Sequence, residues 1–75
     1  MQYTNFGKFI REKRESLRPK TSLNKFAFNN NIEPATLSRI ERCLQGITLD
    51  EIDKIAQGFE IKASELISEY ESKNY

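Results

Sequence analysis

The 75-residue sequence predicts an all-α protein, a compact domain of five helices. Apolar residues recur three and four positions apart in five segments, which is the spacing of one face of a helix. The breaks between these segments contain proline, asparagine or glycine. Hydrophobic residues make up 37% of the chain and charged residues 31%, which is typical of a folded domain. We expect one domain over residues 1–75, with a core over about residues 5–71 and a frayed tail over residues 72–75.

The first helix is expected from about Asn5 to Leu17, and Thr4 or Asn5 can cap it. Pro19 ends it, because proline disfavours the helical conformation of the residue before it. The apolar side of this helix carries Phe6, Phe9, Ile10 and Leu17.

The second helix is short, from about Leu23 to Asn29, with Ser22 as its N-cap and Phe26 and Ala27 facing inward. Three asparagines, Asn29 to Asn31, then form a sharp corner, because asparagine favours caps and turns. Asn31 is the predicted left-handed residue of this turn, and Ile32 returns to the core.

The third helix begins at Glu33-Pro34, since proline suits the first helical position. Its two sides differ in character. The inward side consists of Leu37, Ile40 and, just beyond the helix, Leu44. The outward side is small and polar and consists of Ala35, Thr36, Ser38, Arg39 and Arg42.

The fourth helix opens on "TLDE" at Thr48–Glu51, a capping box. Its expected apolar stripe is Leu49, Ile52, Ile55, Ala56 and Phe59. A fifth helix, about Ala63 to Glu71, carries Leu66, Ile67 and Tyr70.

Several functional classes are excluded by composition. The chain has no histidine and one cysteine, Cys43, so it lacks a Cys–His nucleophile pair and a His or Cys metal cluster. Its three glycines are far apart, so no phosphate-binding loop is present. We therefore expect no enzyme, no metal and no cofactor.

No apolar run approaches the roughly 18 residues of a spanning helix, and the N-terminus has no signal-peptide pattern, so we expect no membrane association and a cytoplasmic location.

Charge is divided unevenly along the chain. Residues 1–42 contain nine Lys or Arg and four Glu, whereas residues 43–75 contain three Lys and seven acidic residues. A basic half suggests that one face meets a polyanion, although an uneven solvated surface would have the same composition.

The outward side of the third helix favours DNA, because arginine can bond a guanine edge bidentately and a threonine methyl can touch thymine. An ordinary solvated helix would be richer there in Glu and Lys.

The sequence resembles the Cro/phage-repressor-like helix-turn-helix family, also called the XRE family, over about Phe6 to Ile67. The strongest parts are "ATLSRIER" at Ala35–Arg42 and "TLDEIDKIAQGFEIKASELI" at Thr48–Ile67. The resemblance implies a lambda-repressor-like DNA-binding domain whose second and third helices form the helix-turn-helix. Asn31 and Cys43 stand where the family usually has glycine.

The expected contacts to double-stranded DNA fall into two groups. The base contacts are Ala35, Thr36, Ser38 and Arg39. The phosphate contacts are Arg14, Lys20, Ser22, Leu23, Lys25 and Arg42. The resemblance also implies that Arg14 pairs with Glu41 between the first and third helices.

We predict a sequence-specific transcriptional regulator, a small bacterial or phage-type repressor or controller that binds a two-fold-related operator as a homodimer. The predicted dimer interface is Ile61, Ile67 and Tyr70; in the alternative, Ile67 and Tyr70 fold back on the first helix. The alternative function is a protein-binding module of the same fold, such as an antitoxin or anti-regulator with a protein partner.

Overall fold

The computed structural model describes residues 5–73 and contains, within that range, five α-helices and no strand. The helices are α1 (Phe6–Glu15), α2 (Leu23–Asn29), α3 (Pro34–Glu41), α4 (Leu49–Gly58) and α5 (Ala63–Glu71). The prediction of a five-helix all-α domain is confirmed. The predicted cap at Thr4 and the last two residues of the predicted frayed tail lie outside the described residues.

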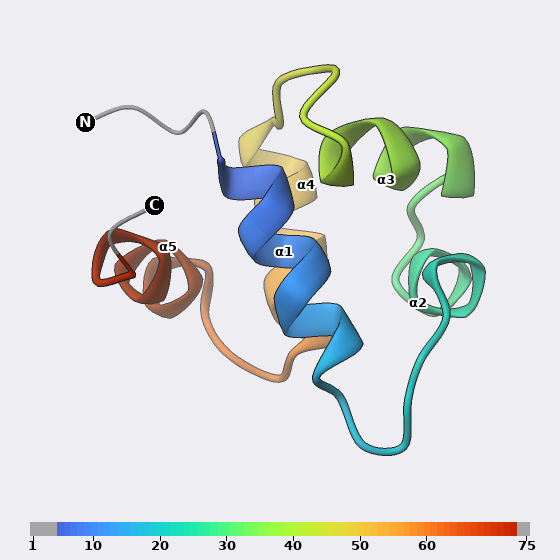
Figure 1. Cartoon of the computed structure of the whole chain (residues 1–75), viewed down its shortest axis with the longest axis horizontal. Coiled ribbons are helices and arrows are strands. Elements are labelled where there is room, and N and C mark those ends of the chain that lie inside the picture. Colours follow the sequence, from blue (N-terminus) through green and yellow to red (C-terminus); the bar gives the residue numbers. More distant parts are fainter. Residues whose placement is uncertain (1–4, 74–75) are drawn as a thin grey trace.

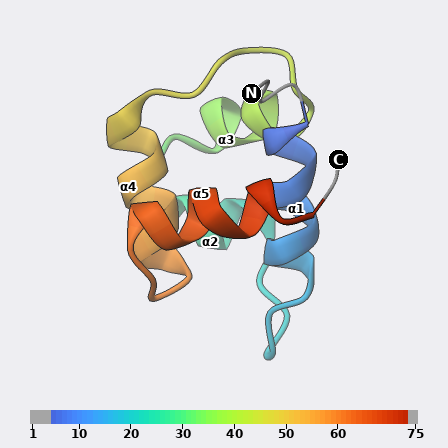
Figure 2. The ribbon, with the colours of Figure 1, turned by 90° about the vertical axis from the view of Figure 1, so that its left-hand side faces the viewer.

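Helix α1 lies in the middle of the molecule, with α2 and α3 on one side and α5 on the other (Figure 1). After a quarter turn, α5 lies across the front, between α4 and α1 (Figure 2). The core between these helices is apolar and consists of Phe6, Phe9, Ile10, Phe26, Ala27, Ile32, Leu37, Ile40, Ile52, Ile55, Ala56, Leu66 and Tyr70. The third helix is thereby held at one edge of the domain, where its outward side faces away from the core.

Two of the three predicted side-chain caps are present. The Ser22 hydroxyl accepts from the Lys25 amide at 3.2 Å, and Thr48 and Glu51 form a complete capping box. Asn5 precedes α1 without a side-chain cap, so of the two candidates expected for this helix Asn5 is wrong, and Thr4 lies outside the described residues. Helix α1 also ends earlier than expected, at Glu15, because the chain turns at Ser16, whose hydroxyl donates to the Lys13 carbonyl at 2.7 Å.

Helices α2, α3 and α4 all end in a left-handed residue that is not glycine. These residues are Asn31 (φ 59°), Cys43 (φ 59°) and Glu60 (φ 60°). In each case the following amide reaches back into the helix, as Ile32 N–H does to the Ala27 carbonyl at 2.9 Å. This is the Schellman arrangement. The prediction for Asn31 is confirmed, and Ile32 is buried as expected.

Leu44 and Leu49 do not face the core, contrary to prediction. Their exposed fractions are 63% and 81%. Leu44 follows the left-handed turn at Cys43, which redirects the chain away from the inward side of α3. Leu49 is the first residue of α4, one turn before the helix meets the core at Ile52.

Gly7 allows α1 and α3 to approach closely. A Cβ atom at this position would lie 1.8 Å from the Ile40 carbonyl oxygen, far inside contact distance. Real structures avoid such contacts, so the backbone would have to move. The spacing between α1 and the end of α3 therefore depends on this glycine.

Gly7→Ala should lower the free energy of unfolding by at least about 2 kcal/mol, because the added methyl group forces the two helices apart. Gly46→Ala is the matched control, since a Cβ there would meet nothing within 4 Å. Urea unfolding measures both. Equal stability of the two variants would contradict the close approach of α1 and α3.

Cys43→Gly should raise the free energy of unfolding by about 0.5–1 kcal/mol, because glycine adopts the left-handed conformation without the cost that a side chain adds. Cys43→Ala keeps that cost and removes only the thiol, so it serves as the control. A glycine variant no more stable than the alanine variant would show that the φ of Cys43 is not strained.

Candidate nucleic-acid interface

Helix α3 is tied to α1 by a buried ion pair between Arg14 and Glu41. Arg14 Nε lies 2.8 Å from Glu41 Oε2, and Arg14 Nη2 lies 2.9 Å from Oε1, so the contact is bidentate. Arg14 is 7% exposed and Glu41 is 4% exposed. Donation of these hydrogen bonds to the Glu41 carboxylate raises the pKa of Arg14 above its ordinary value, despite the opposing effect of burial. The predicted pair is therefore confirmed.

The remaining Arg14 nitrogen is also used. Nη1 donates to the Thr21 carbonyl at 2.9 Å, which fixes the segment leading into α2. One guanidinium thus holds α1, α3 and the start of α2 together. Each of its three nitrogens bonds to the protein and the side chain is buried, so Arg14 serves the fold first, and its phosphate contact stays a prediction.

The outward side of α3 is accessible, as its sequence predicts. Ala35, Arg39 and Arg42 are exposed, and Thr36 and Ser38 are half-buried. Arg42 Nε lies 3.4 Å from the Ser38 carbonyl, so its side chain follows the helix surface. Small residues share this side with two guanidinium groups, and Ala35, Arg39 and Arg42 are open to an external ligand.

Arg39 is oriented by a residue that the sequence did not reveal. Its Nε donates to Gln45 Oε1 at 2.6 Å, and its Nη2 lies 3.4 Å from Thr36 Oγ1. Gln45 is six positions further along, in the loop after α3, so helical spacing cannot predict the contact. The guanidinium keeps N–H donors for an external acceptor.

The surface around α2 and α3 carries cations without carboxylate partners. Residues 20–42 contain four basic side chains, and none of them joins an ion pair within the described part of the chain. Glu33 is the single exposed carboxylate in this stretch, because Glu41 is buried against Arg14. The exposed cations are Lys20, Lys25, Arg39 and Arg42.

The starts of α2 and α3 differ in how they are capped. Ser22 caps α2 with its own side chain, whereas Glu33 makes no side-chain cap at α3 and Pro34 follows it. The first-turn amides of α3 thus remain available to an acceptor outside the helix. The Leu23 side chain packs against the core, so only its backbone could serve the predicted phosphate contact.

The predicted dimer residues do not form one exposed surface. Tyr70 is 5% exposed and lies edge-on to Phe6, with ring centroids 5.1 Å apart and an interplanar angle of 82°. Its assignment to a dimer interface is therefore contradicted, and the alternative of folding back on α1 holds for this residue. Ile61 and Ile67 are half-buried against the core, and their role in association stays a prediction.

Comparisons of this chain with protein-family models, with curated proteins and with solved structures found no match. No helix within residues 5–73 combines the length and the apolar character needed to cross a membrane. Over the same residues, no three His, Cys, Asp or Glu side chains come together as metal ligands could. Function is therefore inferred from the geometry and charge of the α2–α3 surface.

Glu41→Ala should destabilise the fold by about 3 kcal/mol, because it leaves the Arg14 charge buried without a partner. The matched control is Glu15→Ala, which breaks the exposed pair with Arg11 and should cost about 0.5 kcal/mol or less. Urea unfolding measures both. A double-mutant cycle over Arg14 and Glu41 that gives no coupling energy would falsify the pair as a structural tie.

Proposed function

We propose that this protein is a sequence-specific DNA-binding transcriptional regulator of the helix-turn-helix type, with α3 as its recognition helix. The observation that carries the proposal is the outward side of α3, an accessible row of small residues with two guanidinium groups. The four unpaired cations of residues 20–42 support it, because binding to a polyanion needs cations that are not neutralised within the protein.

Base reading is assigned to the middle of α3. The major groove of B-DNA, about 12 Å wide, admits a helix. Ala35 and Ser38 are small enough to let the helix backbone approach the base edges, and the Thr36 methyl suits a thymine methyl. Arg39 supplies the donors for guanine O6 and N7, held in place by Gln45.

Phosphate contacts are assigned to the exposed cations at the edges of this surface. Lys20 and Lys25 flank the start of α2, and Arg42 lies at the end of α3. The Ser22 hydroxyl, which can donate to phosphate while it accepts from the Lys25 amide, and the Leu23 backbone amide complete the set. These contacts would fix the register of α3 on the duplex without reading sequence.

One short recognition helix reads few base pairs, so we propose that two copies bind two half-sites of an operator related by two-fold symmetry. Control then comes from protein concentration, cooperativity or a partner. A regulator of this type acts where the DNA is, which in a bacterial cell is the cytoplasm.

The exposed leucines favour a second candidate, a protein-binding module of the same fold such as an antitoxin or anti-regulator. Leu44 and Leu49 are largely exposed, which is uncommon for large apolar side chains in a small domain. This candidate predicts no salt-dependent affinity for DNA, so one experiment separates the two functions.

The experiment measures binding to a random-sequence duplex over a series of salt concentrations. Neutralisation of about three phosphates by Lys20, Lys25 and Arg42 predicts a slope of roughly −3 for log K against log salt. An absence of binding even at low salt would overturn the DNA-binding proposal and favour the protein-binding module.

Arg39→Ala should cost about 1–3 kcal/mol in binding to a sequence selected from random DNA, because it removes a bidentate base contact. Binding to random duplex should change little. Fluorescence anisotropy with both duplexes measures the difference, and equal losses on the two would assign Arg39 to phosphate instead of a base.

Lys25→Ala should weaken binding to both duplexes alike and reduce the salt slope by about one unit, because it removes one phosphate contact. Lys54→Ala is the control, since Lys54 lies on α4 and pairs with Asp50 at 3.3 Å. If the two lysine variants had the same salt slope, the phosphate assignment of Lys25 would be withdrawn.

A further inference from the structure

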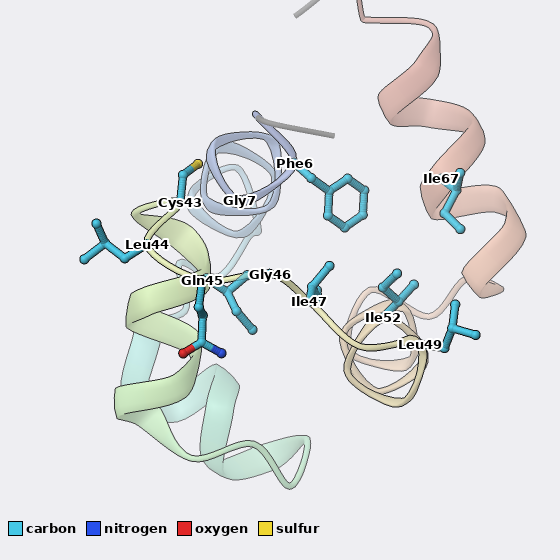
Figure 3. A pocket seen from close by; sticks show the side chains of 11 residues that line it. Phe6, Gly7, Cys43, Leu44, Gln45, Gly46, Ile47, Leu49, Ile52 and Ile67 are labelled. Carbon is cyan, nitrogen blue, oxygen red and sulfur yellow. The ribbon is translucent and has the colours of Figure 1, made fainter. Parts of the chain in front are cut away.

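The side-chain amide of Gln45 is turned toward α3. Gln45 lies in the loop between α3 and α4 and belongs to the lining of an apolar groove of about 930 Å³, which α1, this loop, α4 and α5 form together. Figure 3 shows the Gln45 side chain running along α3, while Ile47 and Ile52 face the hollow on the other side of the loop. The amide oxygen of Gln45 accepts the hydrogen bond from Arg39 on α3.

The backbone fixes where Gln45 lies relative to Arg39. After α3 the chain turns at Cys43, whose φ of 59° is left-handed. The Leu44 amide then donates to the Arg39 carbonyl at 2.9 Å, and the Cys43 amide donates to the Ile40 carbonyl at 3.0 Å. The residue before Gln45 is therefore bonded to the backbone of Arg39 itself, so the Gln45 side chain reaches the guanidinium from a fixed point.

Two arginines use the same edge of the guanidinium in different ways. Arg14 donates from Nε and Nη2 to the carboxylate of Glu41, and both residues are buried. Arg39 donates from Nε to Gln45 Oε1 at 2.6 Å, and its Nη2 lies 3.4 Å from Thr36 Oγ1. An amide and a hydroxyl are neutral, so Arg39 is held in place while its positive charge stays uncompensated.

This hold leaves the far end of the Arg39 guanidinium open. Arginine has five N–H donors, and the donors directed at Gln45 and Thr36 lie on the Nε edge. The N–H groups of Nη1 and Nη2 that point away from Nε are parallel, which suits the two acceptors of guanine, O6 and N7. Arg39 is exposed, so it presents this one end to an external acceptor.

No charged group competes for either partner of this bond. Among the described residues, none that lines the groove is charged, so no ion approaches Gln45 from that side. Arg39 joins no ion pair in the same part of the chain. The contact with Thr36 is longer and therefore weaker. The bond from Gln45 is thus the main restraint on the orientation of Arg39.

We propose that Gln45 is a specificity-determining positioning residue, which sets how well α3 discriminates between bases by orienting Arg39. The inference rests on the proposed function, because it concerns how the recognition helix reads DNA. A long side chain that is ordered before binding loses less conformational freedom when it meets a base. One that is not ordered can turn to a phosphate instead, where it adds affinity but reads no sequence.

Gln45→Met removes the acceptor at an exposed position and keeps the length of the side chain. Binding to a sequence that the wild-type chain selects from random DNA should weaken about two- to tenfold, which is the cost of ordering one long side chain. Binding to random duplex should not weaken. Gln57→Met is the matched control, because Gln57 is also exposed and its side chain bonds to Asp53 on α4. Fluorescence anisotropy measures both duplexes.

An Arg39→Ala background shows whether Gln45 acts through Arg39. In that background Gln45→Met should have no further effect on either duplex, because the side chain that Gln45 positions is gone. A loss on the selected sequence as large as in the wild-type background would show that Gln45 acts on DNA or on the loop directly. That result would overturn the proposal.

Nuclear magnetic resonance of the chain without DNA detects the hold itself. The signal of the Arg39 Nε–H should exchange slowly with water in the wild type and in Gln45→Glu, which keeps an acceptor at the same distance along the side chain. In Gln45→Met it should exchange like that of a free arginine. Unchanged exchange in Gln45→Met would overturn the proposal. Gln45→Glu also neutralises the guanidinium, so it should weaken binding to both duplexes.

The outcomes separate this inference from the proposed function. Equal discrimination between the two duplexes by the wild type and by Gln45→Met rejects the positioning role and keeps the regulator. An absence of binding to every duplex at low salt rejects the regulator, and the positioning role with it. A loss of discrimination in Gln45→Met that disappears in the Arg39→Ala background supports both.

Discussion

The buried pair of Arg14 and Glu41 is the interaction on which the arrangement of the other parts depends. It joins the end of α1 to the end of α3, and the same guanidinium holds the Thr21 carbonyl before α2. Two turns earlier on α1, Gly7 lets the Ile40 carbonyl come close. Helix α3 is therefore fixed from its inner side alone. On its outward side Ala35, Arg39 and Arg42 stay exposed, so this side can be specialised for a ligand.

The surface of this small domain has a basic part and an uncharged apolar part, which lie in different places. Cations without carboxylate partners gather in residues 20–42, while Lys13 and Lys54 elsewhere are paired with Glu69 and Asp50. The groove beside α5 carries no charge at all. A face suited to phosphates and a face suited to apolar contact thus lie on different sides of one core, and Gln45 links them through Arg39.

Local signals in the sequence predicted the helices, because caps, proline and apolar spacing act over a few residues. The Thr48–Glu51 capping box and the left-handed Asn31 are examples. The errors arise where tertiary position decides the outcome. Apolar spacing places Leu49 on the correct side of α4 but cannot show that the first turn extends beyond the core. The bond from Arg39 to Gln45 depends on how the loop folds back, and the burial of Tyr70 depends on where α5 crosses α1.

Nuclear magnetic resonance titration of the chain with a short duplex at low salt tests the central claim most directly, because it reports on every backbone amide at once. If α3 is a recognition helix, the largest shifts should fall on Ala35, Thr36 and Arg39 and on the first amides of α2, while the amides of α5 change little. An absence of shifts at a salt concentration where polyanion binding is strong, or shifts concentrated on α5, would contradict the claim.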